Sequence, residues 1–531
     1  MLVGNRCVTS FVYKLGSAAS VIDDVGSAHR RDRRRCRLTH PETAMSLVRT
    51  KTKTVPAQHD SEPPDPAASP GLTAALDRIG FGRVQAALIL LLMAGLFFDS
   101  LEQNSTGAMG PLLKESFGIG NAELTMINTA TVLGGLAGRL IGGYIADRWG
   151  RRAALSLNLL VYTLGGLISA AAVNYEMLLA SRFIVGIGLG GEFTVGLAIL
   201  AEIVATRHRG SLLATLNISS GGVGNIASFG FFWLVLGPLN GVLGGNDTAW
   251  RWTYVLLAIP ALLVVFFRRY LPESPRFLLS KGRVDEANQS LTRLDGGSIK
   301  ALRKPGATKQ YVTEADIPVQ VKSSYAEVFK GENLRRTAAI GAASWMSFGA
   351  QVTLLFLMPI LLVSRGYSLS DSLAFTMIMN IGSLFGACAA SYLAGKAPRR
   401  LTVSIAAVLG CISAVCFASF AHSTALILVL GMIFQFFTMM LNTMLSVWSP
   451  ELFPTSVRAM GTSVVNGIGN VAGAVMPFAA LFFFDRAGVA GVFAMIAVMY
   501  ALLVVAARFG PETFGKPLEA VTEKPVLAHA A

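Results

Sequence analysis

Residues 142–152 read GGYIADRWGRR and stand between two apolar runs. Four of the last six residues are charged: Asp147, Arg148, Arg151 and Arg152. Residues 391–400, between two later apolar runs, read SYLAGKAPRR, so a tyrosine, an alanine, a base and a closing Arg-Arg recur in the same order. The tyrosines and the closing arginines both lie 248 positions apart (144 to 392, 152 to 400). The two stretches therefore indicate an internal repeat.

A second landmark repeats at nearly the same offset. Glu202 and Arg209 lie seven residues apart at the end of one apolar run, and Glu451 and Arg458 lie seven apart at the end of a later run. The offset is 249 (451 − 202). The chain is thus expected to hold two similar halves. Parallel repeats of this kind are typical of one transporter architecture, with the solute site at the midplane between the halves.

The composition is that of a protein that crosses a membrane repeatedly. Of the 531 residues, 53% are hydrophobic and only 14% are charged, against about 25% charged in a typical soluble domain. A bilayer core takes about 20 apolar residues as a helix. Twelve stretches qualify: 84–107, 123–147, 153–173, 176–204, 211–237, 250–270, 335–364, 370–395, 401–421, 424–449, 457–484 and 488–508.

Five segments follow from this pattern: a tail (1–75), a first six-helix half (76–270), a central loop (271–334), a second half (335–508) and a short end (509–531). The tail carries an arginine cluster at 29–37 and a Pro-rich stretch at 60–70, without the apolar core of a signal peptide. We expect it to be disordered and cytosolic. We expect residues 1–44 to be dispensable, with Met45 as an alternative start.

Lysine and arginine set the expected orientation. The connections at 148–152, 207–209, 271–334, 396–400 and 458 are basic, whereas those around 108–122, 174–175, 238–249 and 422–423 are nearly free of Lys and Arg. The positive-inside rule places the basic set, and both termini, in the cytosol. We expect a bacterial inner (plasma) membrane protein.

The motifs resemble those of the major facilitator superfamily. GGYIADRWGRR resembles its signature between helices 2 and 3, and RFIVGIGLG at 182–190 resembles its helix 4 motif. PESPR at 272–276 and PETFG at 511–515 resemble the sugar-porter-like branch, and LDRIGFGR at 76–83 is similar to the entry segment of metabolite and organic-acid relatives. The resemblance spans about 75–520. It implies an all-α polytopic membrane protein with twelve transmembrane helices in two six-helix repeats, working by alternating access.

One departure from the sugar porters bears on the solute. True sugar porters usually carry paired glutamines near the start of helix 7, whereas this region reads SWMSFGAQVTLLFL, with Gln351 alone. Asp99, Glu102 and Glu192 resemble the acids of proton-coupled carriers of small organic acids, niacin-like solutes included. The resemblance also implies that Gln351 and Asn442 line the cavity, whereas most amides in spanning helices hold helices together.

The buried acids have two interpretations. Asp99 and Glu102 lie three apart and so share a helix face, and Glu192 lies ten residues, or about 15 Å, before Glu202. A carboxylate at that depth is costly unless it is paired, protonated or wet. Either these acids form structural ion pairs, for example with Arg139, or they handle protons and solute. We favour the second role for Asp99 and Glu192, and both remain open for Glu102.

Two arginines in spanning helices are also ambiguous. For Arg139, structural pairing and anion binding are equally compatible with the sequence. Arg182 either snorkels to the interface or is the coupling arginine of the family motif, and we favour the second. The run GIGLGG at 186–191 mimics a dinucleotide-binding fingerprint, but no strand precedes it, so helix packing is the better interpretation.

At the basic turns, anchoring by positive charge explains the arginines but not the acid among them. The resemblance implies an interhelical charge lock that holds the cytosolic side shut, in which Asp147 pairs across the halves with Arg458 or the start of helix 11. The expected lock residues are Asp147, Arg148, Arg151, Arg152, Glu202, Arg209, Glu451 and Arg458.

The sequence therefore predicts a transporter that symports protons with a small organic solute, such as an aromatic or niacin-like carboxylate. A sugar or polyol porter of the same fold is the alternative. A membrane-bound enzyme would need a catalytic, metal or cofactor constellation, and none is visible in the sequence. A nutrient sensor would need an output domain, for which the central loop and the end segment are too small. We expect a monomer in the lipid bilayer, with no cofactor, metal or nucleic-acid partner.

Overall fold

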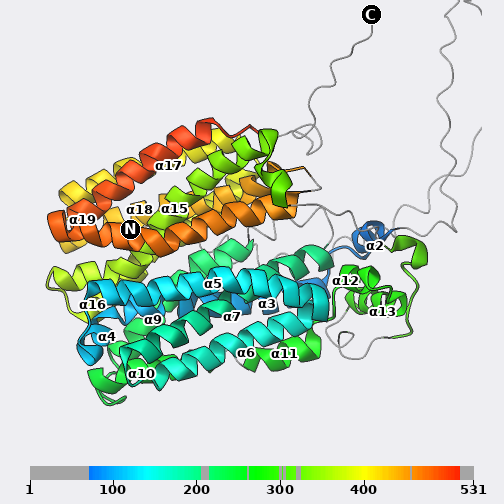
Figure 1. Ribbon diagram of the computed structural model, residues 1–531, viewed down its shortest axis with the longest axis horizontal. Coiled ribbons are helices and arrows are strands. Elements are labelled where there is room, and N and C mark those ends of the chain that lie inside the picture. The colour runs from blue at the N-terminus through cyan, green and yellow to red at the C-terminus, as the bar shows by residue number, and fades with distance from the viewer. Residues whose placement is uncertain are drawn as a thin grey trace, which may run out of the picture. The chain divides into compact units, whose positions relative to one another are not determined.

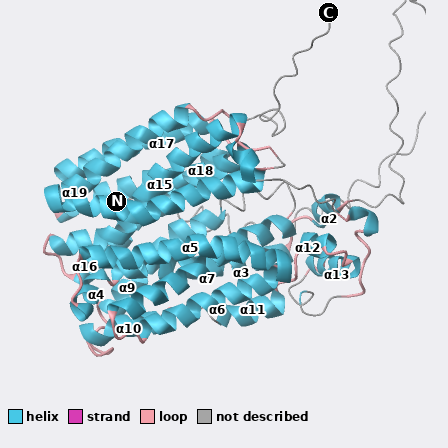
Figure 2. Cartoon of the chain, viewed as in Figure 1, coloured by secondary structure: helices cyan, strands magenta, loops and turns pink. Residues whose placement is uncertain are grey.

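The computed structural model describes residues 71–204, 215–259, 262–297, 302, 306–317, 325–454 and 457–514. They belong to the unit that runs from Pro66 to Ala531. The described residues form helices joined by turns, with no strand among them (Figure 2).

The first half opens with a short amphipathic helix and continues with long apolar ones. The elements are α2 (Leu72–Ile79), α3 (Arg83–Ala108), α4 (Gly110–Phe117), α5 (Asn121–Trp149), α6 (Arg151–Ala170), α7 (Tyr175–Ile203), the π-helix η1 (Ile218–Gly224), α9 (Asn225–Leu236), α10 (Asn246–Leu256) and α11 (Leu262–Tyr270). Four short elements follow: α12 (Pro275–Ser280), α13 (Val284–Leu294), η3 (Glu314–Asp316) and η4 (Tyr325–Phe329). The second half contains α15 (Gly331–Ser364), α16 (Leu369–Ala394), α17 (Arg399–Phe420), α18 (Thr424–Glu451) and α19 (Arg458–Arg508).

Ten helices in the described residues are long and apolar enough to cross a bilayer. Two further predicted spans account for the difference from twelve. Helix α19 holds the last two, because Gly488 breaks it with a φ of 61° and a ψ of −149°. The predicted span 250–270 is divided between α10 and α11, each too short to qualify alone, on either side of residues 260–261.

Several predicted boundaries were wrong by a few residues, and the short helices α2 and α4 of the first half were not predicted. Helix α6 begins at Arg151 rather than 153, and α15 begins at Gly331 rather than 335. Helix α4 was not predicted, because its eight residues include Lys114 and Glu115 and are too few for a span. Its start follows from Pro111 in the first turn, where the missing N–H costs nothing.

Glycines hold helices together in pairs, and they do so twice. A side chain at Gly134 or Gly138 of α5 would collide with a backbone carbonyl of α7, at Phe183 and Ile187 respectively. The same collision recurs 248 positions later between α16 and α18: Gly382 meets Met432, and Gly386 meets Phe436. Close backbone approach of this kind stabilises helix pairs in lipid. The run at 186–191 lies within α7, where Gly186 and Gly190 pack on α5, so the helix-packing interpretation is confirmed.

The helices of the two halves form two neighbouring groups in Figure 1, and α2, α12 and α13 lie together at one end of the first half, here called the linker end. At this end Gln85 of α3 donates to the carbonyl of Leu294 at 3.1 Å, and Ser290 of α13 donates to the carbonyl of Glu273 at 2.6 Å. The first bond fastens α13 to α3 of the first half, and the second fastens it to the connection that follows α11. The end that carries α4 and α10 is called the outer end.

Contacts between the halves extend from the middle of the bundle toward the outer end. Thr129 of α5 donates to the carbonyl of Ala474 in α19 at 2.8 Å. Gly107, near the outer end of α3, has the backbone of Phe356 against it, and Gly221 of η1 has the side chain of Met439 against it. Gly107 and Gly221 have no side chain. At these two positions the backbone of the first half therefore contacts the second half directly, meeting backbone at Phe356 and a side chain at Met439.

Candidate functional site

A buried ion pair joins α3 to α7 in the first half. The guanidinium of Arg182 donates one hydrogen bond to the Glu102 carboxylate and a second, at 3.2 Å, to the Glu102 backbone carbonyl. The side chains are 0% and 2% exposed respectively. A buried charge is tolerated when it is paired and hydrogen-bonded. Each member therefore depends on the other, and removing one leaves an uncompensated charge.

A pair of carboxyl groups lies on the same two helices. Asp99, three residues before Glu102, lies close to Glu192 of α7, and neither of its carboxylate oxygens has a hydrogen-bond partner among the described residues. Two carboxyl groups held close together disfavour being charged at the same time. Gly95, one turn before Asp99, makes room for Glu192, because a side chain at position 95 would collide with the Glu192 Oε1.

The contacts of Arg139 among the described residues do not include an ion pair with Asp99 or Glu192. Its guanidinium carbon is 5.0 Å from the ring centre of Phe193, and its Nε has no hydrogen-bond partner among the described residues. The structural pairing that the sequence allowed for these acids is thus replaced by a carboxyl–carboxyl contact.

The two amides of the second half lie on α15 and α18. The Nε2 of Gln351 is 3.5 Å from the Sδ of Met439, the residue that covers Gly221 of the first half. Asn442 donates to the carbonyl of Thr438, one turn earlier in its own helix, at 3.1 Å. Gln351 therefore lies at the contact between the halves, while Asn442 is engaged within α18.

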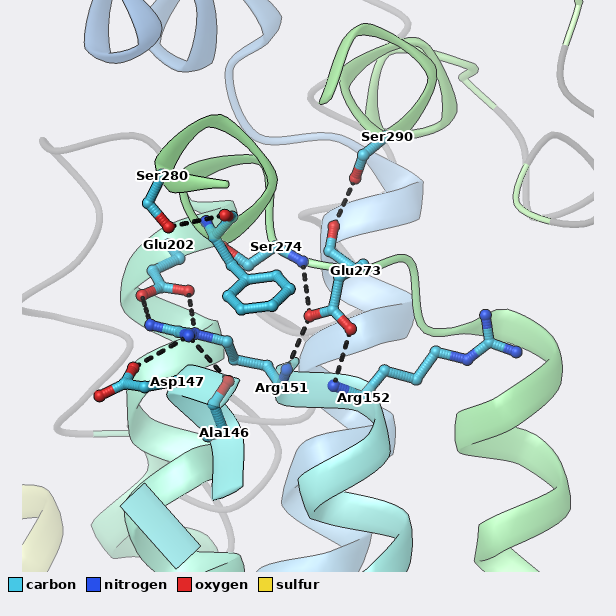
Figure 3. Close-up of polar contacts among 10 residues, drawn as sticks. Ala146, Asp147, Arg151, Arg152, Glu202, Glu273, Ser274, Ser280 and Ser290 are labelled. Atoms are coloured by element: carbon cyan, nitrogen blue, oxygen red, sulfur yellow. Dashed lines mark hydrogen bonds and ion pairs between the residues drawn. The ribbon is translucent and has the colours of Figure 1, made fainter. Parts of the chain in front are cut away.

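A second cluster of charges lies at the linker end of the first half (Figure 3). The Nε and an Nη of Arg151 donate to the two oxygens of Glu202 at 3.0 and 3.1 Å. Asp147 lies on the other side of Arg151, with a charged contact of 3.0 Å. Glu273 accepts hydrogen bonds from the backbone N–H groups of Arg151 and Arg152 at 2.7 and 3.3 Å. Its carboxylate thus caps the positive end of α6.

The second half repeats this arrangement. Arg399 donates to both oxygens of Glu451 at 3.2 and 3.0 Å. Glu512 accepts from the backbone N–H groups of Arg399 and Arg400 at 2.9 and 3.0 Å and so caps α17. Each half therefore has an Arg–Glu pair, here called its clamp, beside a capped helix start. Burial raises the pKa of Glu273 above its ordinary value, although the backbone N–H groups that it accepts from oppose this.

The sequence model of the family described as "Sugar (and other) transporter" matches residues 84–524. The chain belongs to this transporter family. Like the rest of it, this chain is a transporter and not an enzyme. The family match, the ten candidate spans and the paired halves confirm the predicted all-α polytopic fold of twelve transmembrane helices in two six-helix repeats.

Named relatives of this transporter are bacterial. The niacin transporter NiaP of Acinetobacter baylyi is 27% identical over 85% of this chain and 99% of its own length. The putative metabolite transport protein YdjK of Escherichia coli is 28% identical over 85% and 97%. A probable 4-methylmuconolactone transporter of Cupriavidus pinatubonensis is 27% identical over 82% and 93%.

Solved structures place this transporter in the major facilitator fold. A partially occluded, inward-open structure of the xylose transporter XylE from E. coli superimposes with a TM-score of 0.63 at 18% identity. The match covers 82% of this chain and 99% of XylE. A second structure, described as a major facilitator superfamily proton:xylose symporter, gives a TM-score of 0.60.

The transporter's expected lock residues divide between several contacts. Arg148 donates to the hydroxyl of Tyr144 at 3.1 Å, Arg152 reaches the carbonyl of Arg268, and Arg458 reaches that of Phe453. Arg209 lies outside the described residues. Asp147 pairs with Arg151 of its own half, and no bond to Arg458 is formed among the described residues. The lock between halves stays a prediction.

Three participants were missed by the sequence reasoning. Glu273 and Glu512 belong to the repeated PESPR and PETFG stretches, so the repeat itself was a signal that these acids share a role. Tyr254 of α10, whose ring faces Arg182 at 5.3 Å, had no sequence signal beyond being an aromatic residue in an apolar run.

Proposed function

We propose that this transporter couples the entry of protons to the uptake of a small organic carboxylate by alternating access of its two halves. The observation that carries the proposal is the Glu102–Arg182 ion pair on α3 and α7, with Asp99 and Glu192 close together on the same two helices. Glu102, Arg182 and Glu192 are buried, and Asp99 is half-buried with both carboxylate oxygens out of contact with solvent. A proton-accepting group and a buried cation are in contact there. Protonation of the acid therefore changes what the cation can bind.

The proposed cycle follows from charge balance. When Glu102 takes up a proton, it no longer neutralises Arg182, and a solute carboxylate supplies the missing negative charge. Asp99 and Glu192 hold a further proton between them in this cycle, because two neighbouring carboxyl groups disfavour being charged at the same time. One proton carried with one monoanion moves no net charge, so the pH gradient drives the transport. Without a proton on Glu102, the ion pair between Glu102 and Arg182 would stay intact, and Arg182 would not be available to bind the solute carboxylate.

The names of relatives support an organic acid as the solute. A niacin transporter, a putative niacin/nicotinamide transporter and a probable 4-methylmuconolactone transporter are among the similar proteins. The alternative is a sugar or polyol, which the similarity to xylose transporters favours. Gln351 is the proposed solute contact on the second half, because it lies where the halves meet and its partner is a displaceable thioether.

We also propose that the linker end faces the cytosol of a bacterium and that the protein works as a monomer. The concentration of arginines at the linker end supports this orientation. In the outward-open state Asp147 would pair across the halves with Arg458 or the start of α19, which holds the linker end shut. In that state Asp147 would leave Arg151 and pair with this partner in the other half.

Proteoliposomes with an imposed pH gradient, alkaline inside, test this function. We expect labelled nicotinate to accumulate, and a protonophore to abolish accumulation. Asp99→Asn, Glu102→Gln and Glu192→Gln should each lose accumulation, while at least one should still exchange nicotinate without a gradient. Glu115→Gln, an exposed acid of α4, is the control and should behave as wild type. Accumulation of xylose but not nicotinate would support the sugar alternative, and accumulation that survives all three substitutions would refute the coupling.

A further inference from the structure

Arg182 has a second partner besides Glu102. Its guanidinium carbon lies 5.3 Å from the ring centre of Tyr254, which is fully buried on α10. The Arg182 Nε has no hydrogen-bond acceptor among the described residues. The face of an aromatic ring attracts a cation, and more strongly where water is excluded. The ring of Tyr254 thus completes the surroundings of this buried charge.

The ring is held in place by its own neighbours. Trp250, one turn earlier on α10, meets Tyr254 edge to face with the ring centres 6.2 Å apart. Trp250 in turn lies 5.4 Å from the ring of Phe117 in α4 and 4.3 Å from the guanidinium of Arg251. Arg251 is fixed by a 2.8 Å hydrogen bond to the carbonyl of Ala170 in α6. Tyr254 therefore cannot turn away from Arg182 without disturbing its packing against Trp250, which is in turn held by contacts to α4 and α6.

We propose that Tyr254 is a positioning residue, which holds the Arg182 guanidinium in place while Glu102 is protonated and before the solute carboxylate arrives. This inference rests on the proposed proton coupling. When Glu102 becomes neutral, Arg182 loses its counter-charge, and an isolated cation in the membrane interior is costly. The ring supplies attraction that does not depend on the protonation of any acid. The ring thereby lowers the free energy of the intermediate in which Glu102 is protonated and no solute carboxylate is yet bound.

Other charged and titratable groups near this pair are few and are accounted for. Glu102 and Asp99 face the cluster from α3, and Glu192 faces it from α7. Tyr162 of α6 is buried near these acids, and Arg251 is engaged by Trp250 and Ala170. Among the described residues, the contacts of the Arg182 guanidinium are with Glu102 and with the ring of Tyr254. Replacing Tyr254 should therefore change the energy of Arg182 without directly removing a partner of Asp99 or Glu192.

The test compares the pH dependence of nicotinate uptake into proteoliposomes for Tyr254→Leu and Tyr254→Phe. Leucine removes the ring, and phenylalanine keeps the ring while losing the hydroxyl. Without the ring the pair should open less readily, so half-maximal uptake should move about 0.5–1 pH unit toward acid. Phenylalanine should restore the wild-type midpoint. Gradient-independent exchange measured on the same vesicles shows whether each variant is folded and inserted.

Tyr500→Leu is the matched control. Tyr500 is also buried, its ring stacks on that of Phe434 at 5.9 Å, and its hydroxyl is hydrogen-bonded to Thr438. None of the cation–ring contacts among the described residues involves Tyr500. This variant should lower the uptake rate without moving the midpoint. If Tyr254→Leu behaves in the same way, or if Tyr254→Phe shifts the midpoint as far as leucine does, Tyr254 has only a packing role. If wild-type uptake does not depend on pH at all, the proposed coupling is wrong, and this role is wrong with it.

Discussion

Arg151 holds Glu202 by two parallel hydrogen bonds, and the second half contains the same clamp, 248 and 249 positions later, between Arg399 and Glu451. Each clamp joins the start of one helix to the end of another within a single half. Bidentate pairs of this kind fix both distance and angle. The ends of α5, α6 and α7 are therefore braced together, as are those of α16, α17 and α18.

The clamps should contribute measurably to stability. We expect Arg151→Gln and Glu202→Gln each to lower the thermal midpoint in detergent, because each leaves a partly buried charge without its partner. The double variant should be hardly worse than the more damaging single one, with a coupling energy of about 1–3 kcal/mol. Arg399→Gln and Glu451→Gln form the matched cycle in the other half. Additive losses in both cycles would show that the clamps carry no interaction energy.

Asp147 should matter for transport more than for folding. It is 76% exposed and contacts only the edge of a clamp that already has its own acid. Its repeat counterpart is Gly395, which carries no charge, so the acid is present in one half alone (147 + 248 = 395). We expect Asp147→Asn to insert normally and to reduce uptake strongly.

Uptake at equal amounts of membrane-inserted protein is the measurement for Asp147. The comparison variant is Asp371→Asn, an exposed acid in the first turn of α16. Normal uptake by Asp147→Asn would show that the acid serves only to orient the turn.

Glycine packing gives a contrast within one helix. A side chain at Gly190 would collide with the backbone of Gly135 in α5, whereas a side chain at Gly196 meets nothing within 4 Å. Overpacking a tight contact costs about 1–3 kcal/mol. We expect Gly190→Ala to lower the thermal midpoint and Gly196→Ala to leave it unchanged or raise it slightly. Equal effects of the two would mean that the α5–α7 contact yields easily.

Outside the membrane, Asp295 predicts how acid affects the central segment. Burial raises the pKa of Asp295, but hydrogen bonds from Lys309 and Tyr311, both 2.6 Å, outweigh it and hold the pKa below its ordinary value near 3.8. A carboxylate with a lowered pKa stabilises the fold above its ordinary pKa, and this stabilisation is lost as the pH falls through the lowered value. Residues 306–317 should therefore stay attached at neutral pH and loosen only in strong acid.

Cleavage by pepsin between pH 2.5 and 5 would measure this loosening. Wild type should resist at the upper end of the range and be cut within 306–317 at the lower end, while Asp295→Asn should be cut throughout. Asn288→Ala removes an uncharged attachment, its bonds to the backbone of Tyr311 and Val312, and should raise cleavage equally at every pH. If Asp295→Asn resists pepsin as well as wild type does, the Asp295 carboxylate does not hold residues 306–317 in place.

The parts of the fold that depend on local sequence were predictable. Apolar runs of bilayer length, the 248-residue offset and the glycines of α7 each follow from short stretches, because hydropathy and close helix packing leave local signatures. The predicted spans 457–484 and 488–508 are divided close to the break at Gly488, because residues 485–486 are charged. The helix starts at Arg151 and Gly331 were not predicted correctly, because charged residues in the first turn of a helix have the composition of a connecting loop.

For the candidate site, the structure adds the pairing of residues that the sequence had singled out. Asp99, Glu102, Arg182 and Glu192 were chosen because they are charged residues in apolar runs and because they resemble positions of the family. Their pairing was not predictable, because 80 positions separate Glu102 from Arg182 and helix packing decides which of them meet. Glu202 and Arg209 were recognised as a repeated landmark, without an assigned partner for Glu202, and the structure pairs Glu202 with Arg151, 51 positions earlier. For charged residues on different helices, separation along the sequence therefore does not predict which of them form ion pairs.

The attachment of α13 to the first half makes this helix a natural reporter position. Its bonds, from Gln85 to Leu294 and from Ser290 to Glu273, run to elements that move with α3 and α6. A dye on an exposed residue of α13 would therefore travel with the first half. Paired with a second dye at the start of α17, it would follow the opening angle of the transporter by energy transfer between single molecules, with no label inside the bilayer.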